Sequence, residues 1–168
     1  MRRLLLAAAL TALAGAACDA CRRAGASPFP VGGRFLAERV ARRTSTLVNG
    51  PAWATYCPAD SLLVIVALGR TWNGGIALRA VPPLSTPRDF KVQLVLGDLG
   101  TATVAFRAPS AGAARVGAGG TVRVAVGTSV NGRFDVAVPD SGGASIAIRG
   151  TLSQIPFLQL PAATCSSR

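Results

Sequence analysis

Hydrophobic and polar positions alternate along the chain from about residue 44 onward. Val122 and Val124, for example, alternate with Thr121 and Arg123. A period of two residues with one polar face is typical of strands in an antiparallel sheet that has one side in water. Segments with strand chemistry recur at short spacing between turn residues, and we expect eight strands over residues 44–48, 62–68, 76–81, 90–96, 101–107, 121–126, 133–138 and 145–152.

The turn residues support this interpretation. Asn131-Gly132 predicts a two-residue hairpin loop, because both positions tolerate positive φ. Residues 73–75, 98–100 and 140–143 predict three further reversals, and residues 108–120 predict one long connection. No crossover helix separates the strands, so we expect an all-β domain, either an antiparallel sandwich or a small up-and-down barrel of about eight strands.

The part of the chain before residue 44 has a different composition. Residues 19–33 are rich in Ala, Gly, Pro and Arg, which indicates a linker. A short helix is expected over residues 34–42. The expected organisation is therefore a signal peptide over residues 1–17, a basic linker over 18–43 that includes this helix, and a β domain over 44–168.

The N-terminus carries a targeting signal. Arg2 and Arg3 precede an apolar run over residues 4–17, which is too short to span a membrane as a helix but fits a signal-peptide core. Small residues that end in Cys18 resemble a bacterial lipoprotein signal, in which the cysteine is acylated and becomes the mature N-terminus. The alternative is ordinary cleavage after Ala16 or Ala17. Both alternatives predict export, and the first predicts a membrane-anchored protein of the bacterial cell envelope.

Basic residues outnumber acidic residues by 18 to 7, which gives a net charge of +11. A basic segment beside a lipid anchor would attract anionic headgroups, although the same segment could simply be a solvated linker. Nucleic acid is a poorer partner for this chain, because it is exported and lacks a dense basic-aromatic stripe. The candidate membrane-surface residues are Arg22, Arg23, Arg34, Arg39, Arg42 and Arg43.

The chain has four cysteines. Acylation of Cys18 would leave Cys21 in the linker and Cys57 and Cys165 at the two flanks of the β domain. An oxidising envelope makes a Cys57–Cys165 disulfide the expected pairing. Cys18 and Cys21 have the spacing of a metal-binding pair, but no His and no second pair completes a zinc site.

Two short regions resemble a group of β-rich bacterial lipoproteins of unknown function, which are small, secreted and lipocalin-like. Residues 44–53 are similar to that group's opening strand and turn, in which Asn-Gly is followed by a Trp. Gly120-Thr121-Val122, residues 130–134 and residues 149–151 are similar to its closing hairpin. The resemblance covers residues 44–157 and implies a small barrel or sandwich, with no activity assigned.

Composition argues against catalysis. The chain has no His, no Gly-x-Ser-x-Gly elbow and no close pair of carboxylates. We therefore expect no catalytic residues, no metal and no cofactor. The expected function is a non-catalytic envelope lipoprotein that acts as a structural or binding module for an unknown envelope protein.

Two other functions stay open, a carrier of a small hydrophobic ligand inside the barrel and, less favoured, a hydrolase with Ser or Asp residues brought together in space. Trp53, Tyr56 and Trp72 could contact such a ligand or could simply pack in the core. Because the inward-facing residues are mid-sized, we expect a filled interior lined by Val92, Leu94, Val122, Val124, Phe134, Val136 and Ile146.

Overall fold

The computed structural model describes residues 32–40, 44–81, 84–108, 113–139 and 144–158, and all of these belong to a single unit that follows residue 30. This part of the chain is almost entirely β-structure, with one short 3₁₀ turn, η1 (Pro58–Asp60). Its strands are β1 (Arg34–Val40), β2 (Ser45–Cys57), β3 (Leu62–Ala67), β4 (Asn73–Arg79), β5 (Arg88–Val92), β6 (Thr101–Arg107), β7 (Arg115–Val116), β8 (Gly119–Val126), β9 (Ser129–Pro139) and β10 (Ser145–Pro156). The predicted all-β fold is confirmed.

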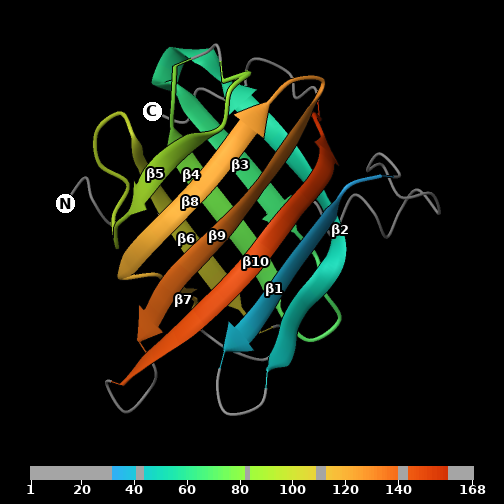
Figure 1. Ribbon diagram of the computed structural model, residues 1–168, viewed down its shortest axis with the longest axis vertical. Helices are drawn as coiled ribbons and strands as arrows, with labels where there is room; N and C mark the ends of the chain where they lie inside the picture. The colour runs from blue at the N-terminus through green and yellow to red at the C-terminus, as the bar shows by residue number, and fades with distance from the viewer. Residues whose placement is uncertain (1–31, 41–43, 82–83, 109–112, 140–143, 159–168) are drawn as a thin grey trace. The chain divides into compact units, whose positions relative to one another are not determined.

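The sheet closes on itself as a barrel (Figure 1). The strand order is β4-β3-β2-β1-β10-β9-β8-β5-β6, and pairing between β4 and β6 completes a ring of nine strands. The short strand β7 lies beside the closure between β4 and β6 and pairs with the second half of β6. Closure removes the free sheet edges that would otherwise template aggregation.

The expectation of eight purely antiparallel strands is wrong in one respect. β5 and β6 pair in parallel, with Lys91 opposite Thr101 and Val92 opposite Ala102. Strand directions cannot alternate all the way around a ring with an odd number of members, so one neighbouring pair must run the same way. The 93–100 connection provides this pair by turning back along the outside of the barrel, where Gln93 N–H donates to the Ala102 carbonyl and Lys91 N–H to that of Gly100.

The short helix expected over residues 34–42 is also wrong. Arg34–Val40 forms β1, which pairs with β2 on one side and with β10 on the other. Phe35 and Ala37 point into the core and are fully buried. The barrel therefore begins at Arg34 rather than at residue 44, because burial between two strands decides the conformation of a segment with no strong propensity of its own.

Two of the predicted turns lie inside strands instead. Asn131 and Gly132 belong to β9, and the hairpin is at residues 127–129, where Gly127 N–H donates to the Ser129 carbonyl. Asn131 instead accepts a hydrogen bond of 2.8 Å from the backbone N–H of Gln154, where the register between β9 and β10 shifts. The expected reversal at 73–75 likewise lies in β4.

The remaining turn predictions had mixed outcomes. The turn at residues 98–100 is confirmed, since Thr101 N–H donates to the Asp98 carbonyl. The turn at 140–143 lies outside the described residues. The long connection at 108–120 includes β7 and the first residues of β8. The expected strand at 90–96 ends at Val92, and Leu94 is 58% exposed rather than part of the core.

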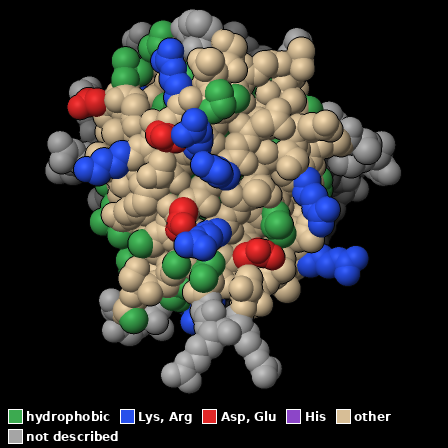
Figure 2. Space-filling view, viewed as in Figure 1, with side chains coloured by type: hydrophobic (Ala, Val, Ile, Leu, Met, Phe, Trp, Pro, Cys, Tyr) green, Lys and Arg blue, Asp and Glu red, His purple; other side chains and the backbone are tan. Residues whose placement is uncertain are grey.

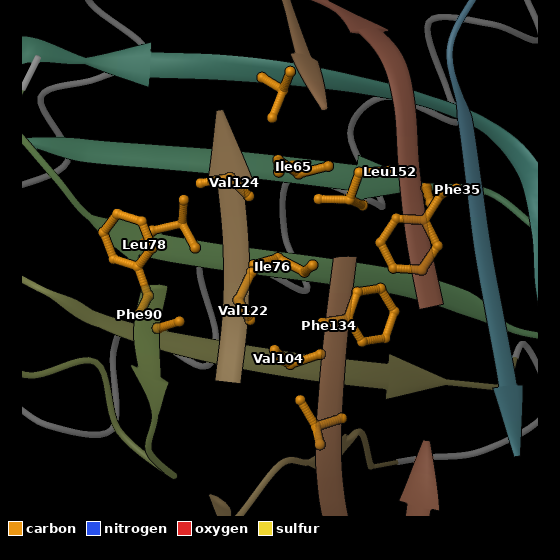
Figure 3. Close-up of a cluster of buried hydrophobic side chains, with 14 of the residues drawn as sticks. Phe35, Ile65, Ile76, Leu78, Phe90, Val104, Val122, Val124, Phe134 and Leu152 are labelled. Atoms are coloured by element: carbon orange, nitrogen blue, oxygen red, sulfur yellow. The ribbon is translucent and has the colours of Figure 1, made fainter. Parts of the chain in front are cut away.

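The interior of the barrel is filled by its own side chains (Figure 3). The ring of Phe134 lies 5.3 Å from that of Phe35 and 6.2 Å from that of Phe106, measured between ring centroids. Two glycines make room for these rings, because a Cβ on Gly150 would collide with Phe134 and one on Gly74 would press on Phe35. The other predicted lining residues are fully or partly buried, namely Val92, Val122, Val124, Val136 and Ile146.

The barrel has two distinct ends (Figure 1). At the end where β1 begins at Arg34, hereafter the chain-entry end, lie η1, the residues that follow β4, and the turn at 127–129. At the opposite end lie the finish of β1, the turn at 68–72 between β3 and β4, and the finish of β6 with β7. Within the described residues, no helix is long and apolar enough to cross a membrane.

Candidate functional site

The aromatic residues considered as ligand contacts take part in the packing of the barrel. Trp53 is only 8% exposed. Tyr56 and Trp72 are half-buried against the core, and the Tyr56 hydroxyl donates to the Ala80 carbonyl at 3.3 Å. The guanidinium of Arg115 lies 5.6 Å from the centre of the Trp72 ring. These three side chains therefore do not form a shared binding surface in the barrel interior.

The outer face instead carries an open groove of about 500 Å³. The groove runs across the outer face of β1, β10, β9, β8 and β5, the strands at the front of Figure 1. The pairing of these strands brings its lining residues side by side. The lining residues are Leu36, Glu38, Asp89, Thr121, Arg123, Arg133, Phe134, Asp135, Arg149, Gly150 and Thr151.

Two rows of side chains cross the groove from strand to strand. In the first row the cross-strand partners are, in order, Glu38, Arg149, Asp135 and Thr121. In the second row they are Leu36, Thr151, Arg133, Arg123 and Asp89. Figure 2 shows the result as red and blue side chains close together across this face.

Two ion pairs occupy part of the groove. Arg149 Nε lies 2.7 Å from Asp135 Oδ2, and Arg123 Nη1 lies 3.3 Å from Asp89 Oδ2. All four side chains are at least 45% exposed, so each pair contributes at most about 1 kcal/mol to stability. Their main effect is to fix the positions of charges on the surface.

Two charged side chains of the groove stand outside these pairs. In the part of the chain that the structure describes, Arg133 and Glu38 each have no ion-pair partner. Arg133 lies directly opposite Arg123, an arrangement of like charges that is unfavourable until an anion approaches. A guanidinium in this position can donate two parallel hydrogen bonds to a carboxylate or a phosphate, and Glu38 can accept from a cation nearby.

The predicted cysteine and arginine sites are divided between described and undescribed residues. Cys57 is buried at the end of β2, 6% exposed, whereas Cys18, Cys21 and Cys165 lie outside the described residues. Arg22, Arg23, Arg42 and Arg43 also lie outside them. Arg34 and Arg39 are exposed residues of β1 at its two ends, so these two do not belong to a linker as expected.

The Arg34 side chain has a local partner. Its Nε donates to Asn49 Oδ1 at 2.9 Å. Arg34 is thereby tied to β2, whereas no such partner ties Arg39 among the described hydrogen bonds.

No pattern in the sequence alone predicts the groove as a site. Alternation within each strand already placed Arg123, Arg133 and Asp135 on the outer face. What it could not supply was the pairing of β8 with β9 and of β1 with β10, which brings distant strands together. No group of three or more His, Cys, Asp or Glu residues that could hold a metal ion occurs among the described residues.

The comparisons with known proteins found no family model, no curated protein and no solved structure that matches this chain.

Proposed function

We propose that this protein is a non-catalytic binding module of the bacterial cell envelope, held at a membrane by a lipid on Cys18, and that it binds its partner on the outer groove. The observation that carries the proposal is the filled interior. The Phe134 ring packs against those of Phe35 and Phe106, and Phe134 and Phe35 also pack over glycines, which leaves the outer surface as the place for recognition.

The filled interior also argues against the alternative function of a hydrophobic carrier. A barrel of about eight or nine strands can be filled by its own side chains or can hold one small ligand, and a carrier keeps that interior hollow. Here Phe35 and Phe106 are at most 1% exposed in the centre of the barrel. A small ligand would have to displace these rings at a cost of several kcal/mol.

The chemistry of the groove indicates what the partner presents. An anionic group, such as a carboxylate, fits between Arg133 and Arg123, while a cationic group fits at Glu38. Leu36 and Thr151 lie beside these charges in the same rows and offer apolar and hydroxyl contacts. A protein segment that carries one anionic and one cationic group would meet these requirements. The exposed ion pairs would help to orient this segment in the groove as it binds.

The lipid anchor is tested first, because it defines the compartment. Cys18→Ser should release the protein from membranes into the soluble envelope fraction. Native mass spectrometry of the wild-type protein purified from the envelope should show the added lipid without a bound small hydrophobic molecule. A variant that still sediments after a carbonate wash would contradict the anchor, and a co-purified hydrophobic ligand would favour the carrier.

The groove is tested separately by site-specific photo-crosslinking in cells. A photoreactive side chain at Thr151, inside the groove, should give a crosslinked partner of defined mass. Ser153 is the matched control, because it is exposed on the same strand two residues further along and does not line the groove. Arg133→Glu should abolish the crosslink at Thr151. Equal crosslinking from both positions, or no effect of Arg133→Glu, would contradict the groove as the binding site.

A further inference from the structure

Charge is distributed very unevenly between the two ends of the barrel. The described part of the chain carries eleven basic and five acidic side chains. At the chain-entry end, four basic side chains, Arg34, Arg79, Arg88 and Lys91, are accompanied by three acidic ones, Asp60, Asp89 and Asp98. At the opposite end lie four arginines, Arg39, Arg70, Arg107 and Arg115, which together we name the arginine end.

Hydrogen bonds and strand pairing bring the members of the arginine end near one another. Arg107 lies opposite Asn73 at the start of β4, and Arg70 lies in the turn just before it. Arg115 sits over the Trp72 ring in the same turn. Thr71 Oγ1 donates to the Leu47 carbonyl of β2 at 3.2 Å, which holds this turn beside the strand that pairs with β1 and Arg39.

Within the described residues, acidic side chains are scarce at this end. Of the five acidic side chains in the described residues, none lies in the connections that form the arginine end. The acidic residue nearest in sequence to a member of the arginine end is Glu38, next to Arg39, and it lines the outer groove. Arg39, Arg70 and Arg115 are exposed. The charges of Arg39, Arg70 and Arg115 are therefore presented to solvent, with little compensation from carboxylates in the described part.

We propose that the arginine end docks on an anionic lipid surface. Arg39, Arg70 and Arg115 are exposed at the rim of the barrel with the half-buried Arg107 beside them, which gives a broad footprint suited to a plane of many negative headgroups rather than to a single ion. Each basic side chain close to such a surface strengthens binding about fivefold. Single-stranded nucleic acid is less well matched, because it needs free aromatic faces for stacking and Trp72 is half-buried beneath Arg115.

The inference rests on the proposed membrane location, and the length of the chain permits it. Residues 19–33 separate Cys18 from the start of β1, and fifteen residues extend to at most about 50 Å. A seven-residue strand such as β1 is only about 23 Å long. A lipid on Cys18 therefore leaves the arginine end free to reach the same membrane, although β1 begins at the other end of the barrel.

The test uses the mature chain from residue 18 with Cys18→Ser, so that no lipid contributes to binding. Its affinity is measured by co-sedimentation with vesicles of phosphatidylcholine alone and with vesicles of an equal mixture of phosphatidylcholine and phosphatidylglycerol. Binding should occur on the mixed vesicles only and should weaken steeply as salt is raised. Arg39→Ala and Arg70→Ala should each weaken it about fivefold.

Arg88→Ala is the matched control, because it removes the same charge from an exposed position at the chain-entry end. It should change binding less than twofold. Equal losses for all three variants would show a response to net charge alone and overturn the proposal, as would tighter binding to single-stranded DNA than to the mixed vesicles. Because the assay uses unlipidated protein, its failure is distinguishable from failure of Cys18→Ser to release the protein in cells.

Discussion

At the scale of single residues, the centre of the barrel depends on the side chain of Phe134. Its ring contacts Phe35 and Phe106 and covers Gly150 on the neighbouring strand. Phe134→Ala should lower the free energy of unfolding by about 3–5 kcal/mol through lost burial and a new cavity. Chemical denaturation of the purified barrel measures this change.

Arg133→Ala is the control for that measurement, because it lies next to Phe134 on the same strand but points to solvent. It should change the free energy of unfolding by no more than about 0.5 kcal/mol. A Phe134→Ala protein that melts within a degree or two of the wild type would contradict the filled interior. Such a result would favour the alternative function, a carrier of a small hydrophobic ligand.

Residue-level prediction from the sequence succeeded where alternation was unbroken and failed where a loop intervened. Val122, Val124 and Phe134 were correctly assigned to the interior, because β8 and β9 alternate without interruption. Leu94 was assigned to the same face, but its strand stops at Val92 to allow the chain to turn back beside β6. Nothing in the local pattern of residues 90–96 distinguishes the two outcomes.

At the scale of elements, β1 is central to the closure of the barrel, although composition assigned it to a linker. It supplies the pairing partner of both β2 and β10 and contributes Phe35 to the core. A chain over residues 32–168 should therefore melt cooperatively, whereas one over 44–168 should lack a cooperative transition and aggregate through two open edges. Circular dichroism during heating compares the two. A cooperative transition of equal midpoint in the shorter chain would show that β1 is dispensable.

Turn signals were the least reliable element predictions, and the reason is physical. Asn131-Gly132 has the chemistry of a hairpin loop, yet the long β9 gains ladder hydrogen bonds to both β8 and β10 by continuing through it. Gly132 also has a packing role, because a Cβ there would collide with the backbone of Arg123. Such glycines mark close approaches between strands as well as turns, and the sequence alone does not separate these two uses.

The C-terminal segment brings the chain back toward Cys57. Phe157 bridges Ala54 of β2 in parallel, Leu158 N–H donates to the Ala54 carbonyl at 2.8 Å, and Thr55 Oγ1 donates to the Leu158 carbonyl at 3.0 Å. Seven further residues reach Cys165, and they can extend about 24 Å. The Cys57–Cys165 disulfide thus stays a prediction that this geometry favours.

Non-reducing peptide mapping of protein extracted from the envelope should show the linked Cys57–Cys165 peptides. Cys165→Ser should lower the free energy of unfolding by about 4–5 kcal/mol in the chain-entropy model, because the bridge closes a long loop. A linked peptide between Cys21 and either of the other two cysteines would show that the pairing is wrong.

At the scale of the whole molecule, the ring of nine strands joins the beginning of the barrel to its end. Arg34 in the first strand lies opposite Ser153 in the last, so β1 cannot complete its pairing until β10 is available. If the chain is exported as proposed, the barrel closes only after its final strand has crossed the membrane. The sheet edges of β1 and β9, between which β10 inserts, stay open until then.

This topology should make folding slow. Pairing between distant strands requires the entropy of long loops to be lost before contacts compensate for it, and all-β domains of this kind fold in milliseconds to seconds. Stopped-flow refolding of residues 32–168 under reducing conditions, followed by tryptophan fluorescence, should give a main phase in that range. Trp53, which is 8% exposed, and the half-buried Trp72 both report on formation of the barrel. A complete fluorescence change in less than a millisecond would contradict closure as the limiting step, since β1 would then find β10 without the cost of the intervening chain.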